Sequence, residues 1–145
     1  MKIKEYLIEI EFELKIETHS AFSFMIKCNA TPDDKGQQIN LFSSSNYECV
    51  TSLYEFNEKG SVVLLEGIYN ERYKPGKNKL SIAVNSYHYP KTIEYYLNDK
   101  LLWVDRRTIW EGKSENEKYG GGLEISTFGI GTLKISSFKV FEPLD

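Results

Sequence analysis

Residues 78–104 read NKLSIAVNSYHYPKTIEYYLNDKLLWV, and residues 123–141 read LEISTFGIGTLKISSFKVF. Both stretches consist of short apolar segments separated by Asn, Asp, Gly and Pro, the residues that favour turns. Apolar residues at every second position indicate strands, because strand side chains point alternately to the two faces of a sheet. Short strands divided by turns at roughly ten-residue spacing predict an antiparallel β-sandwich or barrel.

The opening of the chain shows the same alternation more strictly. One parity is apolar, and the other, apart from Leu7, is charged, almost entirely with glutamate. The apolar members are Tyr6, Ile8, Ile10, Phe12, Leu14 and Ile16. A helix would scatter these residues around its circumference, so residues 5–17 are predicted to form one long strand with a buried face and a wet, acidic face.

The remaining segments complete an all-β pattern. Residues 21–28, 37–43, 47–56 and 61–69 are predicted strands, and the clusters NATPDDKG and NEKG are predicted loops. Residues 105–112 could hold one short turn of helix. Since no linker, repeat or low-complexity tract interrupts the 145 residues, we expect residues 1–145 to form a single domain.

Composition limits the classes of partner. The net charge of −3 argues against nucleic acid and anionic membranes, both of which attract basic surfaces. No run approaches the ~20 apolar residues of a membrane span, and acidic residues interrupt the N-terminal apolar positions where a secretory signal would be continuous. The chain is expected to be cytoplasmic if it is complete, or secreted if it is a domain excised from a longer protein.

The sequence predicts no cofactor. Cys28 and Cys49 are either two reduced thiols or one disulfide, and the spacing does not choose between them. Asp33 and Asp34 are adjacent in a predicted loop, but two acids are too few to define a calcium site.

The C-terminal half resembles the concanavalin A-like (laminin-G-like) jelly-roll superfamily. Residues 80–84 match an L-x-I-x-V strand, residues 93–104 a strand with a tight Asn-Asp hairpin, residues 121–125 a glycine-led strand, and residues 133–140 a closing strand. The resemblance covers about 65 residues by this strand order and implies a two-sheet antiparallel sandwich whose last strand lies beside the first. That superfamily includes lectins, sugar-binding modules, glycoside hydrolases and structural modules, so the fold leaves function open.

The hairpin supplies the main candidate binding residues. If Asn98 and Asp99 form its turn, Tyr95 faces Leu102 and Ile93 faces Val104 on the core side. The opposite face then pairs Tyr96 with Leu101 and Glu94 with Trp103. A flat aromatic beside hydrogen-bonding groups suits a sugar ring, so Tyr96, Trp103 and Glu94 are predicted ligand contacts. The alternative is that a loop covers this face or that it forms a second core layer.

Two further clusters are open to more than one interpretation. Tyr87 and His88 precede Pro90 in a predicted loop, where they either contact a ligand or pack within the turn. Glu9, Glu11 and Glu13 alternate on the first strand as catalytic carboxylates do in some hydrolases of this fold, although a solvated strand face explains them and their acidic neighbours together.

Three functions follow from these features. The favoured one is a non-catalytic binding module whose ligand is carbohydrate. The alternative is a structural or protein-interaction domain of a larger assembly, which an exposed apolar patch or unpaired edge strand would support. The third, a glycoside hydrolase using Glu9, Glu11 and Glu13, requires those carboxylates to lie in a cleft.

Overall fold

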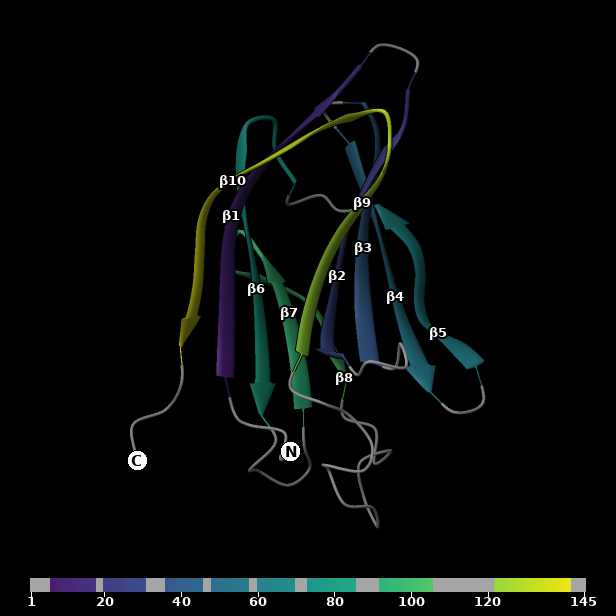
Figure 1. The fold of residues 1–145 in the computed structure, drawn as a ribbon, viewed down its shortest axis with the longest axis vertical. Helices are drawn as coiled ribbons and strands as arrows, with labels where there is room; N and C mark the ends of the chain where they lie inside the picture. The colour runs from purple at the N-terminus through teal and green to yellow at the C-terminus, as the bar shows by residue number, and fades with distance from the viewer. Residues whose placement is uncertain are drawn as a thin grey trace.

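The structure is a computed structural model that describes residues 6–17, 20–30, 36–45, 48–57, 60–69, 73–85, 92–105 and 122–141. Within them, strands form two five-stranded antiparallel sheets that pack face to face (Figure 1). Sheet A has the order β10(Gly131–Phe141), β1(Tyr6–Ile16), β6(Lys77–Asn85), β7(Thr92–Leu97), β8(Lys100–Asp105). Sheet B has the order β5(Gly60–Tyr69), β4(Glu48–Asn57), β3(Gly36–Ser45), β2(Phe22–Ala30), β9(Gly122–Gly129). The predicted all-β sandwich is therefore confirmed. No helix in the described ranges is long and apolar enough to cross a bilayer.

The first strand forms as its alternation predicts. Its apolar parity from Ile8 to Ile16 is buried, whereas its acidic parity stays partly or fully exposed. β1 lies in sheet A between β10 and β6. The predicted return of the last strand to the first is confirmed by the antiparallel register that joins Ile8 to Val140 and Leu14 to Leu133.

The core is one apolar layer between the sheets. It contains Ile10 and Phe12 from β1, Phe24 from β2 and Leu41 from β3, all at most 1% exposed. The Phe12 and Phe24 rings belong to opposite sheets and meet edge to face, with centroids 5.1 Å apart. This geometry is favourable for two aromatic quadrupoles, so the pair ties the sheets together at the centre of the core.

The chain passes from sheet B to sheet A at a glycine corner. β9 ends at Gly129 and β10 begins at Gly131, and in Figure 1 this connection arches across the upper part of the molecule. Gly129 has a φ of +105°, and a Cβ there would lie 2.2 Å from the carbonyl oxygen of Ala21. The same carbonyl accepts a hydrogen bond of 3.0 Å from the amide of Ile130. Only glycine permits this close backbone approach.

The predicted hairpin turn is confirmed. Asn98 and Asp99 have φ values of 52° and 67°, the paired left-handed conformation that a two-residue hairpin requires. Asn98 also holds the turn against β6. Its backbone amide donates to the Lys79 carbonyl at 2.8 Å, and its side-chain Oδ1 accepts from the Lys79 backbone amide at 2.9 Å.

The predicted register of that hairpin is correct only near the turn. Leu97 pairs with Lys100 and Tyr96 with Leu101, but the register then shifts, so Tyr95 pairs with Trp103 and Ile93 with Asp105. The predicted pairs of Tyr95 with Leu102 and of Ile93 with Val104 are wrong, because a bulge inserts one extra residue into β8. Beyond the bulge the two faces of β8 are exchanged relative to the prediction.

A polar seam crosses the core. The Tyr95 hydroxyl donates to Oε1 of Gln37 at 2.5 Å, which joins β7 of sheet A to β3 of sheet B. Gln37 is 1% exposed, and so is Glu55, its register partner on β4. Buried polar groups persist only where they are hydrogen-bonded, so this seam fixes the sheets' relative position at one end of the sandwich.

The two cysteines are free and buried. Cys28 lies opposite Gln37 on β3, which in turn lies opposite Glu55 on β4. Cys49 is six residues away from Glu55 along β4. At ~3.3 Å per residue the two thiols are about 20 Å apart, too far for a disulfide. The alternative of two reduced thiols is therefore the one that the structure supports.

Candidate functional site

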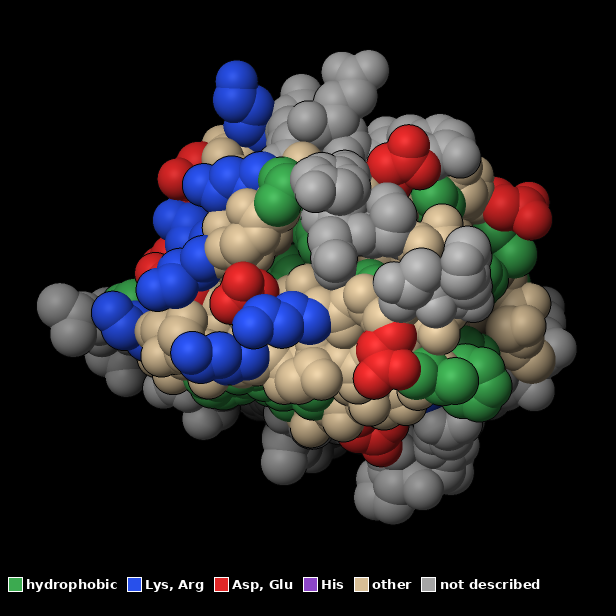
Figure 2. Space-filling model, turned by 90° about the horizontal axis from the view of Figure 1, so that it is seen from above, with side chains coloured by type: hydrophobic (Ala, Val, Ile, Leu, Met, Phe, Trp, Pro, Cys, Tyr) green, Lys and Arg blue, Asp and Glu red, His purple; other side chains and the backbone are tan. Residues whose placement is uncertain are grey.

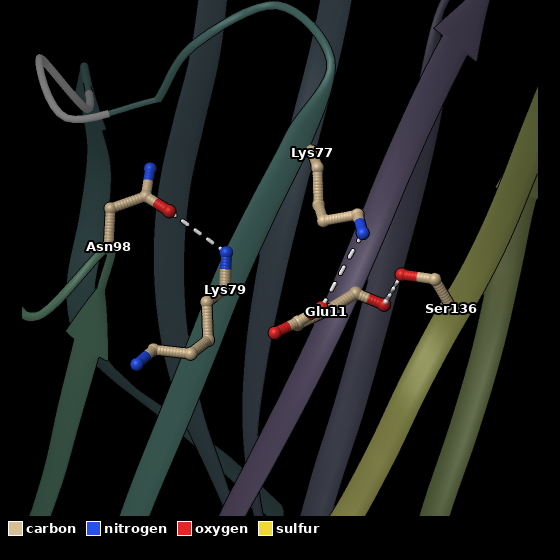
Figure 3. A network of polar contacts seen from close by, with 5 residues as sticks. All are labelled: Glu11, Lys77, Lys79, Asn98 and Ser136. Atoms are coloured by element: carbon tan, nitrogen blue, oxygen red, sulfur yellow. Dashed lines mark hydrogen bonds and ion pairs between the residues drawn. The ribbon is translucent and has the colours of Figure 1, made fainter.

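The outer face of sheet A carries a ladder of ion pairs. Lys77 lies 3.6 Å from Glu11, and Lys79 lies 3.4 Å from Glu9 and 2.6 Å from Asp99. In Figure 3 Lys77 reaches across from β6 to Glu11, whose backbone carbonyl also accepts from Ser136 on β10. The hydrogen bond to Asp99 is the main cause that raises the pKa of the Lys79 ammonium.

This ladder explains the acidic residues of β1. Glu9, Glu11 and Glu13 point outward from the sheet. Each lies opposite a lysine of β6 or β10 in the strand register, and Glu9 and Glu11 also form ion pairs. Opposite charges on neighbouring strands stabilise a sheet face. Figure 2 shows lysine side chains gathered on the side of sheet A with acidic side chains among them. The expected wet acidic face is confirmed, and Glu9 and Glu11 form ion pairs with lysines along it.

The predicted contacts on β7 and β8 are divided between two faces. Tyr96 and Glu94 lie on the outer face of sheet A, where the Tyr96 hydroxyl donates a short hydrogen bond to the Glu94 carboxylate. That bond is the main cause that raises the pKa of the Tyr96 phenol. Trp103 instead pairs with the buried Tyr95 and packs against the core. Tyr96 and Trp103 therefore do not form one aromatic surface.

The other predicted residues cannot be placed. Tyr87 and His88 lie outside the described residues, as do Asp33 and Asp34. Within the described ranges no group of three or more His, Cys, Asp or Glu could hold a metal ion.

The outer face of sheet B differs from that of sheet A in its chemistry. Its central strands β3 and β4 present amides, a hydroxyl and aromatic rings in adjacent rows. Gln38 pairs with Tyr54, and Asn40 pairs with Ser52. Neighbouring strands are ~4.8 Å apart and alternate residues along a strand ~6.8 Å apart, so these four side chains frame an area comparable with one sugar ring. We call Gln38, Asn40, Ser52, Tyr54 and Phe56 the amide–aromatic face.

Local contacts hold this face in one arrangement. Nε2 of Gln38 donates to Oδ1 of Asn40 at 2.7 Å, which orients both amides. Their other amide atoms, Oε1 of Gln38 and Nδ2 of Asn40, thereby present an acceptor and a donor. The rings of Tyr54 and Phe56 lie along the same side of β4 with centroids 6.5 Å apart.

A lysine closes one end of the amide–aromatic face. The Lys27 ammonium lies 4.5 Å from the centroid of the Phe56 ring and 3.8 Å from the Glu124 carboxylate. The Lys27 side chain is only 6% exposed, so its aliphatic part is packed along the sheet while its charge is matched by a ring and a carboxylate. Gly36 makes room for it, because a Cβ there would lie 3.0 Å from the Lys27 Cγ.

Sequence reasoning missed this surface. The sequence predicts strands at residues 37–43 and 47–56, but not their pairing with each other. The available signal was the alternation of Gln38, Asn40 and Phe42 with apolar residues on β3, followed by Tyr54 and Phe56 at the same spacing on β4. Aligning the two strands as a hairpin would have placed amides and rings side by side.

Comparison with known proteins identifies the fold. No protein-family model and no curated protein matches the sequence. Sheep galectin-11, solved in complex with glycerol, is structurally similar with a TM-score of 0.56 and 11% identity over 94% of this chain and 90% of the galectin. A carbohydrate-binding module from Bacillus subtilis, CBM66, gives a TM-score of 0.55 and 12% identity over 94% of this chain and 74% of that module.

These similarities establish the fold, a concanavalin A-like jelly roll, which is the fold that the resemblance noted in the sequence implies. The feature that this chain shares with the galectin and the carbohydrate-binding module is the sandwich of two antiparallel sheets. At such low identity the ligand has to be argued from this chain's own residues.

Proposed function

Starting from a concanavalin A-like jelly roll, we propose that the domain is a non-catalytic binding module that holds a neutral saccharide against the amide–aromatic face of sheet B. The observation that carries this proposal is the strand register that sets Gln38 opposite Tyr54 and Asn40 opposite Ser52. The similarity to a galectin and to a carbohydrate-binding module supports the ligand class.

Each group on this face has a role in the proposed complex. The Tyr54 ring offers a flat apolar surface to the C–H face of a sugar, and its hydroxyl offers a hydrogen bond at the edge. The amides of Gln38 and Asn40 match hydroxyl groups, which both donate and accept. Because the Gln38–Asn40 bond already fixes the amides, little rotamer freedom would be lost on binding.

The charge distribution favours this face over the outer face of sheet A. In sheet A, lysines and glutamates already pair with one another, and a neutral ligand would have to displace those contacts. On sheet B, Lys27 is the register partner of Gln38, and its charge is matched by Glu124 and lies against the Phe56 ring. Gln38, Asn40, Ser52 and Tyr54 themselves are uncharged, as a neutral saccharide requires.

The residues predicted from the hairpin support a second location less well. Tyr96 and Glu94 stay together on the outer face of sheet A, but Trp103 does not join them. Binding there would use one ring whose hydroxyl is already occupied by a carboxylate. We therefore use Tyr96 as the matched control for the sheet B site.

The test is a glycan-array screen followed by calorimetric titration of the saccharide that binds best. Tyr54→Ala should weaken binding at least tenfold, because loss of one stacking ring and its hydrogen bond removes about 1.4 kcal/mol or more. Asn40→Ala should weaken it similarly, whereas Tyr96→Ala should leave it unchanged. Absence of binding to every saccharide would refute the function, and loss of binding in Tyr96→Ala with Tyr54→Ala unaffected would move the site to sheet A.

A further inference from the structure

The exposed large hydrophobic side chains are unevenly distributed over the described residues. Seven of the eleven lie on β9, on β10 or at the corner between them. Those seven are Ile125, Phe128, Ile130, Ile135, Phe138, Val140 and Phe141. Scattered exposed apolar residues are normal, but a contiguous group marks an interaction surface.

Four of these residues point toward the core side of their sheets. Ile135, Phe138 and Val140 on β10 are the register partners of buried β1 residues, and Ile125 on β9 is the partner of the buried Ile26. Nevertheless Ile135 is 39% exposed, Phe138 42%, Val140 51% and Ile125 39%. β10 and β9 are edge strands, and β10 contacts β2, the neighbour of β9, so the two edges lie on the same side of the sandwich, where no described strand covers them. We call Ile125, Ile135, Phe138 and Val140 the apolar edge.

The backbone of β10 is also available for pairing. In the described part of the chain β10 pairs with β1 alone, so its other side presents unpaired amides and carbonyls. Proteins usually protect such edges, because an unpaired strand next to apolar side chains is a template for a further strand. The apolar edge and the free strand edge thus coincide on one surface.

We propose that this surface pairs two copies of the chain, with β10 antiparallel to β10 of the second copy about a twofold axis. A twofold axis perpendicular to the sheet keeps the inner sides together, so Phe138 and Val140 of one copy meet apolar residues of the other. On the outer side Lys134 and Lys139 are register partners of Glu13 and Glu9. Each copy therefore brings a charge-balanced rim to the contact.

The dimensions fit a stable dimer. β10 has 11 residues, which at ~3.4 Å per residue gives a contact about 37 Å long. Two sheets ~10 Å apart with their side chains give an edge about 20 Å deep, hence about 700 Å² on each copy. Specific interfaces bury about 800 Å² per partner, so the edge of one sandwich suffices for a second copy.

Sedimentation equilibrium of the intact chain tests the proposal. The wild-type protein should show a mass of twice 16.8 kDa, which is 33.6 kDa, at about 100 μM. The double variant Phe138→Glu/Val140→Glu should sediment as the 16.8 kDa monomer with an unchanged circular dichroism spectrum. The matched control is Phe128→Glu, because Phe128 is 76% exposed but lies on the outer face of β9, and this variant should stay dimeric.

A cross-link keeps the test decisive if the double variant does not fold. Setting Phe138 opposite Ile135 of the second copy keeps these inner-face side chains together and puts the twofold axis between Ser136 and Ser137, so two copies of Ser136→Cys would lie close together beside it. Mild oxidation should then give a disulfide-linked dimer, since Cys28 and Cys49 are buried. A monomeric wild type, a dimeric Phe138→Glu/Val140→Glu variant, or absence of the cross-link would each overturn the proposal.

Discussion

The edge-to-face contact between Phe12 and Phe24 provides a quantitative test of the sandwich. Phe12→Leu and Phe24→Leu each remove a ring while keeping most of the apolar volume. A volume-conserving change costs up to about 1.5 kcal/mol, and the lost aromatic contact adds about 0.5–1.5 kcal/mol. Each single variant should therefore lose about 1–3 kcal/mol of the free energy of unfolding, within the range that a domain of this size tolerates.

The coupling between the two changes is the informative quantity. The double variant should be less destabilised than the sum of the single variants by about 0.5–1.5 kcal/mol, because the second change removes a contact already lost. Urea unfolding followed by circular dichroism measures all four proteins of the cycle. Phe12→Leu combined with Ile93→Val is the control, since register places Ile93 six residues along the sheet, about 20 Å away. A coupling of zero between Phe12 and Phe24 would contradict the packing of β1 on β2.

Three further outcomes are expected. Gly129→Ala should lower the free energy of unfolding more than Gly60→Ala does. Both glycines have positive φ, but of these two only Gly129 would place a Cβ 2.2 Å from a backbone carbonyl. Equal urea midpoints for the two variants would contradict the close backbone approach at the glycine corner. Burial raises the pKa of Cys28 and of Cys49 from 9.0 to about 12. The folded state therefore favours the neutral thiols, so their contribution to stability should be constant below pH 9 and fall as the pH rises toward 12. Cys28→Ala/Cys49→Ala should reduce the loss of stability between pH 9 and 12 in urea titrations. Tyr95→Phe should cost about 1–3 kcal/mol in urea unfolding, because it removes a donor from a buried amide oxygen; an unchanged midpoint would argue against the polar seam.

Local patterns were enough to predict most of the strands. The alternation in β1 specifies both its extent and its buried face, because a shift by one residue would bury the glutamates. The Asn98-Asp99 turn follows from the tolerance of these residue types for positive φ. The return of the last strand to the first came from the resemblance, and the register of β1 with β10 bears it out.

Features that depend on distant contacts were not predictable in the same way. The bulge in β8 shifts the register after Tyr96, and no residue type nearby signals it. The bulge places Trp103 against the core, whereas Tyr96 and Glu94 stay on the outer face, so the predicted ligand contacts do not lie together. The amide–aromatic face depends on the pairing of β3 with β4, and the polar seam on contact between sheets. Both join residues that one strand's periodicity cannot relate.

The most direct test of the central claim is a backbone amide NMR titration with the best-binding neutral oligosaccharide. The proposed function predicts saturable chemical-shift changes centred on Gln38, Asn40 and Tyr54, with β6 and β7 unaffected. Shifts centred instead on Tyr96 and Glu94 would contradict the sheet B site. Absence of shifts with every saccharide tested would contradict carbohydrate binding itself.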